Sequence, residues 1–113
     1  MITLRTELNR RRLRMLVDVC ETTYECGRGL LFRRRLRADE ALLIPRCRSV
    51  HTVGLWYPLD LAFCSIDGTV LTVVRRLPPC RVARNGAAWS VWELAPGTIE
   101  ALALAPGDRL VAR

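Results

Sequence analysis

Two acidic residues and one histidine interrupt apolar stretches of this chain, and their types suit acid–base chemistry. Asp60 lies in the alternating run 59–66, Glu93 lies in the run 88–94, and His51 is the single histidine. Two carboxyl groups about 5–9 Å apart are the minimum that glycoside hydrolysis requires. A carboxylate beside a histidine can also transfer protons. One hypothesis is therefore a hydrolase that uses Asp60 with Glu93 or with His51.

A structural role for Asp60 competes with that hypothesis. A buried carboxylate is costly unless it is paired or hydrogen-bonded, so we expect His51, an arginine or backbone N–H groups to bind Asp60. One interpretation is that Asp60 holds the turn over residues 54–58. The other is a shallow ligand site, for which the candidate residues are His51, Thr52, Trp56, Asp60 and Glu93.

Other chemistries are poorly supported by the residue types. All eighteen basic residues are arginine, which excludes a Schiff-base lysine and the lysine of a P-loop. Metal sites generally need several His, Cys or carboxylate ligands at matched spacing, and a lone histidine does not provide them. None of the serines considered as nucleophiles, Ser49, Ser65 and Ser90, has a nucleophile-elbow context. We predict no metal and no cofactor.

The formal net charge of +7 is concentrated in the first half of the chain, where residues 1–50 carry twelve arginines against six acids. Guanidinium groups suit phosphate, so the clusters at 10–14 and 33–37 give a second alternative, electrostatic binding of nucleic acid. Both clusters lack the interleaved aromatic residues of single-strand binding platforms. Solubility is the favoured explanation of the charge, and nucleic acid is not a favoured partner.

The cysteines indicate a reducing compartment. Cys20, Cys26, Cys47, Cys64 and Cys80 are odd in number and show no C-x-x-C spacing, which is typical of free thiols. The N-terminus has no apolar run of secretory length, and no stretch approaches the ~20 apolar residues of a membrane span. We expect a cytoplasmic protein without a membrane span.

Alternating apolar residues predict strands over several segments of the chain. These segments are 2–8 and 12–20 as a first hairpin, then 41–44, 59–66, 69–74, 88–94 and 108–112, with 49–57 extended. Residues 77–87 read as a loop. Trp89 and Trp92 fall on opposite faces of one strand, so we expect one of them to line a surface or groove.

Turn and cap residues complete the expected fold. Thr22-x-x-Glu25 forms a capping box that predicts a helix over about 23–28, and Pro96 opens a second helix over 98–104. Asp67-Gly68 predicts a type I′ hairpin with positive φ at both positions. Together these elements indicate one domain over residues 1–113, of the α+β, mostly β class: a small, partly closed β-barrel-like sheet with two short helices.

Several segments, in order, resemble the uncharacterised bacterial and archaeal family called domain of unknown function number 192. The matching segments span residues 13–112: Thr22-x-x-Glu25-x-x-x-Gly29-Leu30-Leu31-Phe32-Arg33, His51-Thr52-x-Gly54-Leu55-x-x-Pro58-Leu59-Asp60-x-x-Phe63, Asp67-Gly68-x-Val70, Glu93-Leu94-x-x-Gly97 and Pro106-Gly107-Asp108. The chain departs from the family pattern at Cys26, where an arginine is usual, and at Leu31, where methionine is frequent.

The resemblance implies a compact domain with a barrel-like sheet and short helices, and it implies no reaction, cofactor or substrate. We therefore expect a binding or accessory module of unknown biochemical activity, with a small ligand or a protein as its partner. The hydrolase and the electrostatic nucleic-acid binder remain the two alternatives.

Overall fold

The computed structural model describes residues 2–20 and 35–113, which contain nine strands and one short helix. The elements are β1 (Ile2–Leu8), β2 (Arg11–Val19), β3 (Glu40–Pro45), β4 (Ser49–His51), β5 (Leu59–Cys64), β6 (Val70–Leu77), β7 (Val82–Arg84), β8 (Ser90–Leu94), α2 (Thr98–Leu102) and β9 (Leu110–Ala112). Most of the predicted strands are confirmed. The short strand β7 lies inside the segment predicted to be a loop.

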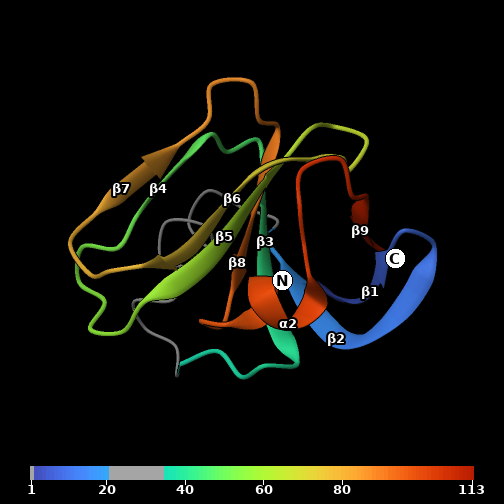
Figure 1. The fold of residues 1–113 in the computed structure, drawn as a ribbon, viewed down its shortest axis with the longest axis horizontal. Coiled ribbons are helices and arrows are strands. Elements are labelled where there is room, and N and C mark those ends of the chain that lie inside the picture. Colours follow the sequence, from blue (N-terminus) through green and yellow to red (C-terminus); the bar gives the residue numbers. More distant parts are fainter. Residues whose placement is uncertain (1, 21–34) are drawn as a thin grey trace.

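Seven strands form one sheet in the order β6-β5-β8-β3-β2-β1-β9, and β4 pairs with β7 in a separate two-stranded ribbon (Figure 1). Neighbouring strands are antiparallel except β2 and β3, which run parallel. A parallel pair cannot be joined by a tight hairpin, so β2 and β3 are neighbours in the sheet without being a hairpin.

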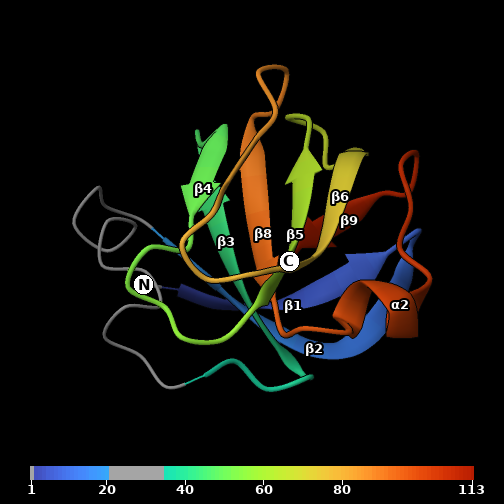
Figure 2. The same ribbon diagram turned by 60° about the vertical axis from the view of Figure 1, so that its left-hand side comes forward.

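The central strands β5 and β8 are buried on both faces of the sheet. One face, the helix face, packs Ala62, Trp92 and Leu94 against Ile99 of α2. The opposite face, the ribbon face, packs the residues Leu61, Phe63 and Val91 against Val50 of β4. In Figure 2 the α2 helix lies at the lower right and β4 at the upper left. Double-sided burial explains why most residues of these two strands are apolar.

The predicted partly closed, barrel-like sheet is not supported, because the sheet does not close into a barrel. The two sheet edges, β6 and β9, meet at one place, where an isolated bridge joins Thr69 to Arg109. Backbone hydrogen bonds from Leu110 N–H to the Gly68 oxygen (2.8 Å) and from Val70 N–H to the Asp108 oxygen (2.7 Å) surround that bridge. Closure into a barrel needs a ladder along paired strands. β9 forms such a ladder with β1, but its side of the sheet meets the β6 side only around this one bridge.

The prediction of two short helices is not supported. The helix expected over residues 23–28 lies outside the described residues. The other helix is present as α2, which begins at Thr98 and is shorter than predicted because Ala103 already adopts a left-handed conformation (φ 50°). In the part of the chain that the structure describes, no helix has the length and apolar character needed to cross a lipid bilayer.

The turn at Asp67-Gly68 connects β5 to β6 as expected, but it is not a type I′ turn. Gly68 N–H donates to the Ser65 oxygen (3.0 Å), and Gly68 has a positive φ (89°) whereas Asp67 does not. This pattern matches a type I turn followed by a glycine bulge. A separate irregularity in the pairing of β5 with β6 lies further along the strands, between Phe63 and Cys64.

Candidate functional site

Asp60 is fully buried and binds two backbone N–H groups. Its Oδ1 accepts from Arg76 N–H (2.8 Å) on β6, and its Oδ2 accepts from Ile99 N–H (2.9 Å) in the first turn of α2. The α2 helix has Gly97 at its N-cap, so no side chain of the cap itself binds the free N–H groups. Asp60 supplies that acceptor from another element of the fold.

The expectation that backbone groups would bind Asp60 is therefore confirmed, but those groups are not in the 54–58 turn. Arg76 has a left-handed backbone (φ 49°) next to an irregularity in the pairing of β5 with β6. Asp60 therefore anchors both this irregularity and the helix to the central strand.

Glu93 and Asp60 lie on opposite faces of the sheet. Asp60 is the cross-strand partner of Leu94, and Glu93 is the partner of Leu61. Because successive side chains of a strand point to opposite faces, Asp60 lies on the helix face and Glu93 on the ribbon face. The two carboxylates are separated by the sheet and do not form the acid–base pair of the hydrolase hypothesis.

Thr52 connects two loops from a buried position. Its hydroxyl group donates to the Pro78 oxygen (2.6 Å) and accepts from Arg81 N–H (2.9 Å). His51, the preceding residue, ends β4 and is exposed. Trp56 is 87% exposed, and its ring contacts Tyr57 edge to face at 6.2 Å.

The five residues predicted to form a ligand site are thus not assembled in one place. Thr52 and Asp60 are buried and hydrogen-bonded to the backbone, and Glu93 lies on the ribbon face. His51, at the end of β4, and Trp56, in the segment that follows it, are exposed. A ligand role for His51 and Trp56 stays a prediction.

A pocket of about 550 Å³ lies on the helix face, at the opposite end of β8 from Asp60. We call it the tryptophan pocket, because Trp89 and Trp92 line it together with Leu43 of β3. Arg109 and Arg113, which flank β9, complete the pocket. This volume and this mixture of apolar walls with a few charged groups are typical of small-molecule sites.

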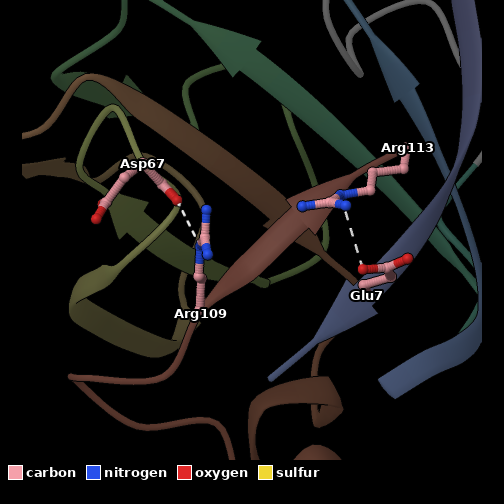
Figure 3. A network of polar contacts seen from close by, with 4 residues as sticks. All are labelled: Glu7, Asp67, Arg109 and Arg113. Carbon is pink, nitrogen blue, oxygen red and sulfur yellow. Dashed lines mark hydrogen bonds and ion pairs between the residues drawn. The ribbon is translucent and has the colours of Figure 1, made fainter. Parts of the chain in front are cut away.

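One hydrogen bond and one ion pair hold the polar rim of the tryptophan pocket (Figure 3). Arg109 donates from Nε to the backbone oxygen of Asp67 (3.0 Å), and Arg113 lies 3.7 Å from the Glu7 carboxylate. The Arg113 side chain is 63% exposed, so this ion pair is well solvated. Both guanidinium groups are consequently placed by the protein at the mouth of the pocket.

Asp67 remains ionised near neutral pH. Hydrogen bonds from the Ser65 hydroxyl group and then from Thr69 N–H lower the pKa of Asp67 from 3.8 to about 2. Burial, and then the negative charge of Asp67, raise the pKa of the Cys64 thiol from 9.0 to about 12. The Cys64 thiol is therefore neutral and is not a nucleophile in the folded protein.

The sequence of residues 5–112 matches the DUF192 family, described as "Uncharacterized ACR". The chain belongs to the DUF192 family. This confirms the resemblance found from the sequence motifs, and it assigns no activity. No functionally curated protein matches the chain.

Two solved structures share the fold of this DUF192 chain. One is a "putative transcription regulator" from Sinorhizobium meliloti 1021, with 26% identity, a TM-score of 0.85, and coverage of 98% of this chain and 94% of that chain. The other is a protein of unknown function from Novosphingobium aromaticivorans DSM 12444, with 21% identity, a TM-score of 0.81, and coverage of 96% and 84%. The similarity to the second structure shows the fold alone.

The tryptophan pocket of this DUF192 protein was only partly visible in its sequence. The expectation that one tryptophan of the 88–94 segment would line a groove is confirmed, because Trp89 is 37% exposed and Trp92 is buried. Both nevertheless line the same pocket, since Trp89 precedes the first paired residue of β8 and escapes strand alternation. Arg109 and Arg113 had no sequence signal, because the pairing of β9 with β1 places them.

Among residues 2–20 and 35–113, no group of three or more His, Cys, Asp or Glu side chains could hold a metal ion.

Proposed function

We propose that this DUF192 protein is a binding module that holds a small molecule with an apolar body and one anionic group in the tryptophan pocket. The observation that carries the proposal is the placement of Arg109 and Arg113 at the rim of a cavity lined by Trp89 and Trp92. Indole rings provide a large apolar contact area, and guanidinium groups bind carboxylates through two parallel hydrogen bonds.

A binding role is favoured over hydrolysis for a structural reason. Each oxygen of the Asp60 carboxylate already accepts a backbone N–H, and the removal of either bond would release α2 or β6. The regulatory description of the Sinorhizobium protein also fits a module that senses a ligand. Cys64 and Cys80 are free thiols, which fits a location in the cytoplasm.

The test uses 2-naphthoate as the probe and the neutral 2-naphthol as its matched counterpart. Binding should shift the indole N–H signals of Trp89 and Trp92 in proton–nitrogen NMR spectra. The Arg109→Gln variant should bind 2-naphthoate about tenfold more weakly, the scale of one charged hydrogen bond, and should bind 2-naphthol unchanged. Arg75→Gln, at an exposed position on β6, is the matched charge control.

The proposal is rejected if millimolar 2-naphthoate shifts neither indole signal. It is also rejected if Arg75→Gln and Arg109→Gln weaken binding equally, because the charge would then act from anywhere on the surface.

A further inference from the structure

A second hollow, of about 710 Å³, lies beside the tryptophan pocket and has a different character. It is formed by the connection between β3 and β4 and by the loop that joins β7 to β8, which projects in orange at the top of Figure 2. We call it the arginine hollow; its lining residues are Arg46, Cys47, Arg48, Ser49, Arg84, Ala88 and Trp89. Among the residues that the structure describes, no acidic side chain lines it.

Backbone hydrogen bonds bring these distant segments together. Ser49 of β4 pairs with Arg84 of β7, and Asn85 N–H donates to the Arg48 oxygen (2.9 Å). Cys47 N–H donates to the Trp89 oxygen (3.1 Å), whose own N–H bonds to the end of β5 (2.8 Å). The backbones that carry the arginines and the tryptophan are therefore held in fixed positions relative to one another.

The arginines of the hollow have uncompensated charge. Arg46, Arg48 and Arg84 are exposed, and within the described ranges none of their guanidinium groups makes an ion pair or a hydrogen bond. Trp89 is 37% exposed beside them. Clustered arginines with an accessible aromatic ring are the two components by which proteins bind single strands, since the charges attract phosphates and the ring stacks on a base.

We propose that the arginine hollow binds single-stranded nucleic acid, with a base stacked on Trp89 and the flanking phosphates bound by Arg46, Arg48 and Arg84. A duplex is a poorer fit, because its bases are already stacked on each other and an indole ring reaches only a base that is splayed out. The site is separate from the small-molecule site of the proposed function, although Trp89 borders both.

The test measures fluorescence anisotropy of a fluorescein-labelled twelve-residue oligothymidylate over a series of NaCl concentrations. Three phosphate contacts predict a slope of log K against log[NaCl] of about −2, at about 0.7 for each contact with a single strand. The triple variant Arg46→Gln, Arg48→Gln, Arg84→Gln should bring this slope close to zero. The triple variant Arg11→Gln, Arg12→Gln, Arg14→Gln removes the same charge from the β1–β2 hairpin and should leave the slope near −2.

A second pair of variants tests the stacking. Trp89→Leu should weaken binding of the oligonucleotide roughly 5- to 150-fold without changing the salt slope, because it removes a stacked base and no charge. Trp56→Leu changes an exposed tryptophan of another loop and should leave the affinity as it is. Circular dichroism of every variant establishes that each is folded.

Three results would overturn the inference. The first is the absence of binding at 20 mM NaCl, and the second is an equal loss in the two arginine triple variants, which would mean diffuse electrostatic attraction. The third is that thymidine monophosphate displaces the oligonucleotide and binds as tightly as the oligonucleotide does, which would make the ligand a free nucleotide. Arg109→Gln should not affect the oligonucleotide, so the two proposed sites can fail independently.

Discussion

Replacement of Asp60 by asparagine tests how the helix and the bulged strand are held. The side chains have nearly the same shape, but an amide has one oxygen where the carboxylate has two. Asp60 accepts from Arg76 N–H at 2.8 Å and from Ile99 N–H at 2.9 Å. In the Asp60→Asn variant one of these buried donors would therefore face an NH₂ group and lose its acceptor.

The expected cost follows from that count of bonds. A hydrogen bond to a charged group contributes about 1.5–3 kcal/mol, and an unsatisfied buried donor costs about 1–3 kcal/mol. The neutral amide is easier to bury than the carboxylate, which offsets part of this loss. We expect Asp60→Asn to lower the free energy of unfolding by about 2 kcal/mol. For a domain slightly above 100 residues this corresponds to a fall in Tm of about 8 °C.

Urea unfolding followed by tryptophan fluorescence measures this loss, since Trp92 is buried and reports on the core. Hydrogen exchange at Arg76 and Ile99 gives an independent measurement, because at least one of the two amides should lose protection. The control is Asp39→Asn at an exposed position, which should stay within about 0.5 kcal/mol of the unsubstituted protein. Unchanged stability of Asp60→Asn with both amides still protected would refute the anchoring role.

Two further predictions concern close packing and thiol ionisation. Alanine at Gly68 (φ +89°) would place its Cβ 2.7 Å from Val111 Cγ1, whereas alanine at Gly107 (φ +95°) meets nothing within 4 Å. In urea unfolding, Gly107→Ala should lower the free energy of unfolding by about 1–2 kcal/mol, because alanine is strained in a left-handed backbone. Gly68→Ala should lower it by about 1–3 kcal/mol more, because its Cβ also overpacks against Val111. Equal losses in the two variants would contradict the close approach at Gly68. Burial raises the pKa of Cys64 to about 12. Iodoacetamide at pH 8.5 should therefore modify the exposed Cys80 and leave Cys64 unmodified until urea unfolds the protein. Peptide mass spectrometry measures the modification of each cysteine. The unfolded thiol ionises near pH 9.0 and the native one does not, so the contribution of Cys64 to stability is complete below pH 9 and declines as the pH rises toward 12.

Local patterns predicted most of the strands and some properties of single residues. The alternation in 59–66 and 88–94 predicted β5 and β8, and Pro96 predicted a helix where α2 is found. A carboxylate in an apolar strand indicated that Asp60 must be bound by other groups, because burial of an unpaired charge is too costly. These inferences succeed since they depend on neighbours in the chain and on the cost of removing charge from water.

The tertiary structure alone decided which distant residues meet. Strand register placed Asp60 and Glu93 on opposite faces, because a shift of pairing by one residue reverses the face of every side chain. The two sheet edges, β6 and β9, meet only around one bridge, so the sheet stays open. The arginines of residues 46, 48 and 84 have no common pattern in the sequence, yet the pairing of β4 with β7 and the bond between Cys47 and Trp89 place them around one indole ring. Hydrogen bonds between segments some forty residues apart determine that arrangement, and composition or periodicity within a single segment carries no information about them.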